Sequence, residues 1–496
     1  MKGALAAAFM CVFAIGQGHV FDYGVAWPLG KESLVADIDG DGVAEVLQHE
    51  WFWSAGTGHA FFYRALQGNG LWSQAAGQVP RTELNLVRFE PLAVADFDGD
   101  GHVDVFMDRW RMGLPPNELS DVLLLGDGRG GMRDASNRMP ATLTWLYDAE
   151  ALDIEGDGDL DIFASGPSGT YVYVNDGAGA FTDESATRLL GGLVLHGHAS
   201  ASVDADLDGD LDVFVANGIT TQQPSVVWSN DAGVFTPVVV GSPPSWGYAV
   251  ILVDANSDGH DDVIQCIAGV PPTPYLASPG ATGMVAAPAL RPAWPSPYVP
   301  TMSTASDQST ALDWDGAGDR DVWLTIGNRV VLWENTGSGF VDISNRLFQP
   351  PTWSGAYHLV LDYDLDGDDD VLVAGDQNSG NLYVSRVRAA RALTPPTLGG
   401  QYAVEFTARA NHAMLGVLGI APARFQVPGL GWVFLDPAQS AFVGSTFFAT
   451  HSNRSLSVAV PNQPALTGFA VGMQGIDVDL TTGLLQTTTR PSSVIR

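Results

Sequence analysis

Acidic residues recur along this chain in a nine-residue pattern that has the composition of a cation-binding loop. Copies begin at Asp37, Asp96, Asp153, Asp204, Asp254, Asp313 and Asp362. Most copies carry carboxylates at positions 1, 3, 5 and 9, and every copy has glycine at position 6. Alternate residues of a tight loop converge on one point, position 7 adds a backbone carbonyl, and Ca²⁺ prefers such oxygen ligands. The pattern therefore predicts calcium loops.

The predicted calcium ligands occupy the same loop positions in each copy, and His102 and His260 would coordinate through their backbone carbonyls alone. Copies one to three supply Asp37, Asp39, Asp41, Val43 and Glu45; Asp96, Asp98, Asp100, His102 and Asp104; and Asp153, Glu155, Asp157, Asp159 and Asp161. Copies four and five supply Asp204, Asp206, Asp208, Asp210 and Asp212, and Asp254, Asn256, Asp258, His260 and Asp262. Copies six and seven supply Asp313, Asp315, Asp319 and Asp321, and Asp362, Asp364, Asp366, Asp368 and Asp370. We expect six or seven Ca²⁺ ions, with the sixth loop weakest because Ala317 replaces a carboxylate.

Two other kinds of structure share parts of this pattern. A helix–loop–helix calcium hand begins in the same way but requires a bidentate Glu at position 12, which every copy lacks. Aspartate- and glycine-rich turns that merely solvate loops are the second alternative. Seven copies in register favour the metal loops.

The spacing of the copies indicates the fold. Successive copies start 49 to 59 residues apart, a period typical of four-stranded propeller blades. An apolar segment precedes each loop and another follows it, and most units add a hairpin with a glycine-rich turn, as at 172–181. The sequence predicts an all-β fold, a seven-bladed β-propeller over residues 19–394. Each acidic loop should join the first two strands of a blade.

The seventh unit lacks a fourth strand, because the chain after 382–384 continues through three arginines without a glycine turn. The segment Val20–Tyr23 resembles the fourth-strand segments at 181–183 and 340–342. We therefore expect this N-terminal segment to pair with the seventh blade and close the ring. A frayed N-terminus is the alternative.

The loop pattern, its spacing and the glycine–phenylalanine hairpins resemble the FG-GAP/VCBS repeats of secreted bacterial proteins and of the integrin α-subunit propeller. The resemblance covers residues 20–394 and implies a calcium-binding β-propeller. Members of the family include adhesion and ligand-binding propellers, and some are attached to enzymes. The resemblance therefore assigns no activity.

The first residues predict an exported protein. Lys2 precedes an apolar run from Ala4 to Ile15 and then small residues, which is the pattern of a secretory signal peptide over residues 1–18. No other stretch is long and apolar enough to span a bilayer. Cleavage would leave Cys266 as the single cysteine, so we expect a secreted or cell-surface protein without an intramolecular disulfide.

Charge limits the classes of partner. The chain has 56 acidic and 23 basic residues, a formal net charge of −33, and only two of the basic residues are lysines. A sequence this acidic, without a basic patch, argues against nucleic acid and anionic membranes as partners. A cation is the expected small partner.

Residues 395–496 differ in composition from the repeats. Five arginines and four acidic residues give this region a net charge of +1, and short apolar stretches such as 403–406 and 456–460 predict a β-sandwich-like domain. Proline-containing segments at 427–429 and 460–466 resemble a C-terminal module of secreted proteins from planctomycete-like bacteria. Sorting, surface attachment and glycan contact are the roles open to it.

Polar residues stand four to six positions before six of the loops: Glu90, Asp148, His198, Tyr248, Asp307 and His358. In a propeller they would line the central channel on the face opposite the loops, where they could bind a ligand or act as acid and base. Residues that only satisfy the polar ends of strands are the alternative.

The sequence contains no nucleophile elbow, zinc-protease helix, phosphate loop or paired cysteine ligands. We therefore expect a non-catalytic, monomeric binding or adhesion protein for an extracellular glycan or protein. A polysaccharide lyase or hydrolase built on the propeller is one alternative. A structural component of the cell surface is the other.

Overall fold

The structure is a computed structural model that describes most of the chain. Its described residues are 21–26, 33–40, 44–49, 61–67, 71–74, 87–111, 121–191, 197–217, 223–241, 247–267, 270–279, 284–292, 309–314, 319–326, 329–347, 355–362, 369–375, 380–385, 390–394, 401–408, 412–419, 422–427, 431–435, 440–448, 452–459, 470–479, 485–487 and 492–494. The predicted signal peptide lies outside them, as do the predicted site residues Asp41, Val43, Asp307, Asp315, Asp364, Asp366 and Asp368.

Strands dominate the described part of the chain, which contains seven four-stranded antiparallel sheets. The first three sheets are β2 to β5 (Ser33–Ala36, Glu45–His49, Phe61–Gln67, Leu71–Gln74), β6 to β9 (Val87–Ala95, Asp104–Arg111, Val122–Gly126, Met132–Asp134) and β10 to β13 (Asp148–Leu152, Asp161–Gly166, Gly169–Asn175, Phe181–Asp183). The next three are β14 to β17 (Gly197–Val203, Asp212–Asn217, Ser225–Asp231, Val234–Val240), β18 to β21 (Gly247–Val253, Asp262–Ile267, Val270–Leu276, Val285–Ala286) and β22 to β25 (Thr310–Leu312, Asp321–Ile326, Arg329–Asn335, Phe340–Asp342). The last contains β26 (Gly355–Leu361), β27 (Asp370–Gly375), β28 (Gly380–Ser385) and β1 (Phe21–Ala26).

Short helical turns follow three of the fourth strands. Helix α1 (Ser185–Arg188) follows β13, and 3-10 turns at Ser136–Arg138 and Ser344–Arg346 follow β9 and β25. In all three, a serine hydroxyl donates to an aspartate two residues before it, as Ser136 does to Asp134. Each turn ends in an arginine at the edge of its sheet.

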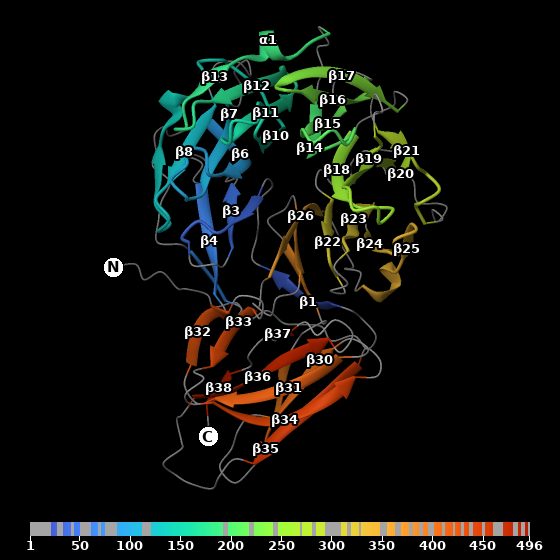
Figure 1. Cartoon of the computed structure of the whole chain (residues 1–496). Helices are drawn as coiled ribbons and strands as arrows, with labels where there is room; N and C mark the ends of the chain where they lie inside the picture. The colour runs from blue at the N-terminus through green and yellow to red at the C-terminus, as the bar shows by residue number, and fades with distance from the viewer. Residues whose placement is uncertain are drawn as a thin grey trace.

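The sheets surround a common centre, because the first strand of each contacts the first strand of the next. β2 contacts β6, β6 contacts β10, and the series continues through β14, β18, β22 and β26, which contacts β2 again. Figure 1 shows these strands toward the middle of the ring and the fourth strands β13, β17, β21 and β25 at its rim. The fold is the β-propeller that the sequence predicted.

Each acidic loop joins the first strand of its sheet to the second. The loop begins directly after the first strand, and the acid at position 9 is the first residue of the second strand. These second-strand acids are Glu45, Asp104, Asp161, Asp212, Asp262, Asp321 and Asp370. Equivalent placement in every repeat brings the loops to one face of the ring. The predicted connection is confirmed.

The N-terminal strand completes the last sheet. β1 pairs antiparallel with β28, with Phe21 opposite Ser385 and Ala26 opposite Gly380, and the order of this sheet is β1-β28-β27-β26. The expectation that the N-terminal segment supplies the missing fourth strand is confirmed. Strands from opposite ends of the repeat region therefore share one sheet.

The apolar cores lie between neighbouring sheets. Phe106 of β7 packs against Tyr173 of β12, with ring centroids 6.3 Å apart, within a cluster drawn from both sheets. Trp323 and Tyr383 form the corresponding contact between β23 and β28, at 5.0 Å. Because each sheet buries both faces against its neighbours, the second strands are apolar on both sides, as in 105–107.

The strands after the ring form separate sheets, drawn in orange and red in Figure 1. One contains β29 (Ala390–Thr394), β30 (Gln401–Ala408) and β35 (Ser452–Ala459), and another contains β34 (Ser440–Phe448), β31 (His412–Gly419), β36 (Ala470–Asp479) and β37 (Leu485–Thr487), with β38 (Ser492–Val494) beside β36. β32 (Pro422–Val427) pairs with β33 (Gly431–Leu435). β29 pairs with β30 rather than with β28.

The predictions about membrane-spanning segments and about Cys266 can be compared with the described structure. None of the described helices has the length and apolar character needed to cross a membrane. Cys266, on β19, is a free thiol, and burial raises its pKa to about 12. A thiol with such a pKa is protonated and unreactive at neutral pH.

Candidate functional site

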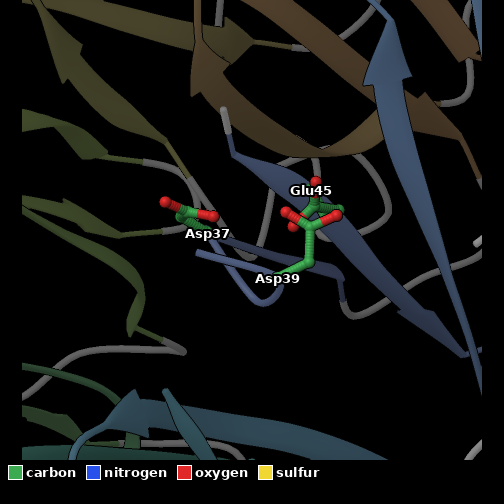
Figure 2. Close-up of side chains that lie close together, drawn as sticks. All are labelled: Asp37, Asp39 and Glu45. Carbon is green, nitrogen blue, oxygen red and sulfur yellow. The ribbon is translucent and has the colours of Figure 1, made fainter. Parts of the chain in front are cut away.

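The carboxylates of four acidic loops converge. In each loop, oxygens from three acids lie within 4.8 Å of one another: Asp37, Asp39 and Glu45; Asp96, Asp98 and Asp104; Asp204, Asp206 and Asp212; Asp313, Asp319 and Asp321. Figure 2 shows the first group on the turn between β2 and β3. With Ca–O distances of about 2.3–2.6 Å, ligands of a single ion lie up to about 5 Å apart. The spacing therefore suits one cation in each loop.

The acid at position 9 also holds the backbone of its loop. Asp104 accepts hydrogen bonds from the Phe97 N–H at 2.8 Å and from the Gly126 N–H, at the end of the third strand, at 2.8 Å. The same two bonds recur at Asp161, Asp212, Asp262 and Asp321. Burial nevertheless raises the pKa of Asp104 to about 6, because desolvation outweighs the stabilising hydrogen bonds.

The acid at position 1 closes the turn itself. Asp96 accepts from the N–H groups of Asp100, at 3.1 Å, and Gly101, at 2.8 Å. Asp254 makes the equivalent bonds to Asp258 and Gly259. These bonds fold the loop back on its first residue, so its side chains face the same centre.

The acids at position 5 lie farther out. Asp100, Asp157, Asp208 and Asp258 are exposed, and each accepts a hydrogen bond from the N–H of position 7. None of the four belongs to a converging group among the described residues. The structure therefore brings together positions 1, 3 and 9 in loops one, two and four and positions 1, 7 and 9 in loop six, and it leaves the described position 5 acids at the solvent edge.

Two residues in each of loops two to five, whose turns are fully described, adopt left-handed backbone. Position 6 is glycine, with φ of 87° at Gly101 and 104° at Gly209, as the sequence predicted. Position 4 has the same conformation, at Gly99, at Leu207 (φ 60°) and at Ser257 (φ 58°). The left-handed backbone at position 4 was not predicted, because copies four and five have a leucine and a serine at that position.

The donor set fits a hard divalent cation. Asp98 Oδ1 and Asp206 Oδ1 are buried in loops two and four and have no hydrogen-bond partner among the described residues. A buried carboxylate oxygen without a partner is costly. A cation held by positions 1, 3 and 9 would satisfy these oxygens, and an all-oxygen, anionic donor set favours Ca²⁺ over softer metals.

The remaining loops differ or are described only in part. In loop three, Glu155 at position 3 forms an ion pair with Arg188. In loop five, Asn256 donates to Asp258 at 2.9 Å. In loop seven, Asp362 and Asp370 are described, and Asp370 accepts from the Ser385 N–H at 2.7 Å. Within the described parts of these three loops, no group of three acids converges.

Asparagines that were not predicted as functional residues connect loops two, three and five to the next sheet. Asn175, at the end of β12, donates to the Phe97 carbonyl of the preceding loop at 2.7 Å. Asn230 and Asn335 donate in the same way to Ile154 and Asp254. All three amides are buried. The available signal was the asparagine that precedes the glycine-containing turn in these three repeats, whose partner lies about 80 residues away.

A cavity of about 330 Å³ occupies the centre of the ring. First strands of six sheets line it, and its polar lining includes Asp148, Ser200, Ser309, Thr310 and His358. Two of the six predicted channel residues, Asp148 and His358, are therefore brought to one cavity. Its mixture of apolar walls and a few polar groups is typical of ligand pockets.

A second acid lies beside Asp148. Asp148 accepts from the Ser200 N–H at 2.6 Å, while Glu150 accepts from the hydroxyls of Ser200 and Ser202, each at 3.2 Å. Desolvation, with the nearby charge of Glu150, raises the pKa of Asp148 to about 8. The pKa of Glu150 is also raised, by desolvation. Glu150 was missed, although its i, i+2 spacing from Asp148 places both on one side of β10.

The other predicted channel residues are placed less fully. His198 lies on β14 against Tyr147, with ring centroids 5.2 Å apart, and Tyr147 in turn contacts Trp145 at 5.6 Å. Glu90 and Tyr248 lie on the first strands β6 and β18. Asp307 lies outside the described residues.

Comparison with protein families identifies the repeats. The profile described as FG-GAP-like repeat matches residues 153–215 and 204–264, two overlapping spans that each begin at an acidic loop. The chain contains FG-GAP-like repeats. The FG-GAP-like match covers loops three to five, and the expected VCBS assignment and the planctomycete-like C-terminal module stay predictions. No curated protein matches the chain.

Several solved structures resemble the chain at low sequence identity. A lectin from Agrocybe aegerita that recognises non-reducing terminal N-acetylglucosamine has 15% identity and a TM-score of 0.47, over 76% of this chain and 90% of that one. Trypanosoma rangeli sialidase in complex with sialic acid has 10% identity and a TM-score of 0.39, over 98% and 92%. The Schwanniomyces occidentalis β-fructofuranosidase has 6% identity and a TM-score of 0.31, over the same shares. TM-scores this low say nothing about what the chain binds.

Proposed function

We propose that this chain is an exported β-propeller, braced by calcium in its acidic loops, that binds an extracellular glycan or protein without catalysis. The observation that carries the calcium part is the convergence of carboxylate oxygens in four loops. The partnerless, buried Oδ1 of Asp206 adds weight, because a bound cation would satisfy this oxygen. Six or seven ions remain the proposed number.

The residues that would hold each ion are the acids at positions 1, 3 and 9, with further oxygens from positions 5 and 7. Bound Ca²⁺ would neutralise the converging charges and would join the end of the first strand to the start of the second. Position 9 is bonded to the third strand, as Asp212 is to Asn230, and Asn230 is bonded to the preceding loop. An ion in one loop would therefore stiffen the contact with the neighbouring sheet.

The central cavity is the proposed ligand site. A cavity of about 330 Å³ can hold a sugar residue or an inserted side chain. Asp148, which holds its proton near neutral pH, could donate a hydrogen bond from its carboxylic acid group, and the hydroxyls of Ser309 and Thr310 could donate or accept. Such groups suit neutral, hydroxyl-rich ligands better than anions. The protein is proposed to act outside the cell as a monomer.

Binding screens on glycan and protein arrays, with calcium present, test this proposal. His358→Ala combined with His198→Ala should weaken binding of any ligand found, while leaving the melting temperature nearly unchanged. Asp127→Asn, on the exposed turn between β8 and β9, is the control and should bind normally. Equal affinity of the double variant and the wild type would move the site away from the cavity.

An enzymatic role is the second candidate, and one observation favours it. A carboxyl group whose pKa is about 8 in a central cavity has the protonation that a general acid requires. A secreted polysaccharide lyase or hydrolase would then use Asp148. Activity screens on acidic polysaccharides with wild type and Asp148→Asn decide between the candidates. Turnover that disappears in the variant would establish the enzyme.

A further inference from the structure

Loop three differs from its neighbours in the residue at position 3. Loops one, two and four have aspartate there, whereas loop three has Glu155. Its side chain is one methylene longer, and Glu155 Oε1 lies 3.1 Å from Arg188 Nη2. Arg188 is the last residue of α1, the short helix that follows the fourth strand of the same sheet.

The Arg188 guanidinium is fixed by three contacts. Besides Glu155, its Nε donates to Glu184 at 2.7 Å, and its Nη1 donates to the Gly233 carbonyl at 2.9 Å. Gly233 lies in the hairpin turn between β16 and β17 of the next sheet. The side chain is only 17% exposed. A guanidinium held in this way is far less screened by water than an ordinary surface arginine.

Loops two, three and four differ in how closely an arginine approaches the acid at position 3. In loop two, Arg138 ends the equivalent turn, but its Nη1 lies 3.9 Å from Asp98 and donates to the Ala178 carbonyl instead. In loop four, no ion pair to Asp206 occurs among the described residues. Loops three and four both carry acids at positions 1, 3, 5, 7 and 9. They therefore match in charge and differ in the arginine.

We propose that Arg188 is the resident cation of loop three, and this inference rests on the proposed calcium binding. The guanidinium neutralises position 3 in the metal-free protein, so loop three stays ordered without calcium. Calcium entering loop three must compete with an ion pair that is already formed. Loop three therefore binds calcium more weakly than loop four, which depends on the metal for its order.

Hydrogen exchange on the full-length protein tests this inference loop by loop. Peptides that contain residues 153–161 and 204–212 report the protection of loops three and four at each calcium concentration. In the wild type, loop three should be protected in EDTA and change little with calcium, whereas loop four should gain protection as calcium rises. In Arg188→Gln, loop three should lose its protection in EDTA and regain it with calcium.

The size of the change is set by the competing ion pair. The calcium midpoint of loop three should fall about fivefold in Arg188→Gln, the factor that ~1 kcal/mol of ion-pair energy gives. Arg188→Lys keeps the charge and should retain part of the protection in EDTA, which guards against a variant that simply misfolds. Glu155→Asp combined with Arg188→Gln should make loop three respond to calcium as loop four does. Arg133→Gln, an exposed arginine on β9, is the matched control and should change nothing.

Two results would overturn the inference. One is an equal calcium midpoint for loops three and four in the wild type. The other is an Arg188→Gln variant whose loop three loses the same protection at every calcium concentration, which would make Arg188 a structural link between sheets and nothing more. A loop four that ignores calcium would instead overturn the proposed calcium brace.

Discussion

The acidic loops and the central cavity both remove carboxyl groups from water, but they stabilise them differently. In the loops, backbone N–H groups hold the acids and aim three of them at one point, as with Asp204, Asp206 and Asp212. Asp148 lines the cavity and Glu150 lies beside it on β10; both accept from serines, and the raised pKa of Asp148 leaves it protonated near neutral pH. One arrangement suits a metal ion, and the other suits a proton.

The difference shows that acid content alone does not define a site. Converging oxygens held by backbone donors can share one metal cation, although burial also raises the pKa of the acid at position 9, to about 7 at Asp212. Two acids that share a poorly solvated strand face, with few hydrogen-bond donors around them, reduce their charge by taking up protons. The geometry of the donors therefore decides which cation the acids bind.

Removal of calcium should produce the largest effect. At tenfold excess over its dissociation constant, each independent site adds about 1.4 kcal/mol, so six or seven sites add on the order of 8–10 kcal/mol. EDTA should therefore lower the melting temperature of the propeller by many degrees and expose it to protease, as calorimetry and limited proteolysis can measure. The strands after residue 395, whose net charge is near zero, should melt independently of calcium. Superimposable melting curves in EDTA and in millimolar calcium would contradict the brace.

Substitutions within loop four distinguish the role of its buried acid at position 9 from that of its exposed acid at position 5. Asp212 is buried, accepts from two backbone N–H groups and belongs to the proposed metal site, so Asp212→Asn should cost about 3 kcal/mol in EDTA and more in calcium. Asp208 is exposed, and Asp208→Asn should weaken stability only when calcium is bound. Chemical denaturation of both variants, with calcium and with EDTA, measures the four values. An Asp212→Asn variant that loses no stability in EDTA would mean that position 9 serves the metal alone.

The raised pKa of Asp148 predicts that the stability of the fold depends on pH, through a bound proton rather than a bound calcium ion. The pKa of Asp148, about 8 in the folded protein, lies above its usual 3.8, so folding retains a proton that the unfolded chain has released between about pH 4 and pH 8. Stability should therefore fall as the pH rises through this window, by on the order of 2 kcal/mol between pH 6 and pH 8. Asp148→Asn removes this titration and should flatten the curve. Denaturation in saturating calcium at both pH values checks it, and parallel curves for the two proteins would refute the assignment.

The smallest predicted effect concerns the turn of loop five. Ser257 is exposed and adopts φ of 58°, a conformation in which a side chain is strained. Ser257→Gly should relieve this strain and raise stability by about 0.5–1 kcal/mol. Ser338→Gly, at an exposed position in another hairpin, serves as a control and should not stabilise. A destabilised Ser257→Gly would show that the entropy of the unfolded chain outweighs the strain.

Much of the scaffold could be predicted because its signals are local and repeated. The nine-residue pattern places each loop between two strands, and the missing fourth strand after 382–384 has its replacement in the segment beginning at Phe21. The expected clustering of loop acids is found at positions 1, 3 and 9 in loops one, two and four. Local patterning is informative here because every repeat meets the same surroundings.

The features that were missed depend on contacts between repeats. Asn175 bonds to a carbonyl of the preceding sheet, and Arg188 links its own loop to the hairpin of the next one. Neither contact leaves a pattern within a single repeat. Glu150 was missed for a related reason, because its serine partners belong to the neighbouring first strand. Such pairings follow from how the sheets pack, which spacing alone does not reveal.

The pairing of β1 with β28 sets the order in which the ring can form. Phe21 and Ser385 stand at opposite ends of the repeat region, so their sheet is a contact of very high sequence separation. During synthesis or export, the first strand to emerge must wait until the last repeat arrives. Until then the seventh sheet has a bare edge beside β28, which invites pairing with another chain. Folding of this protein should therefore be slow at its final step, and its misassembled forms should exchange β1 between molecules.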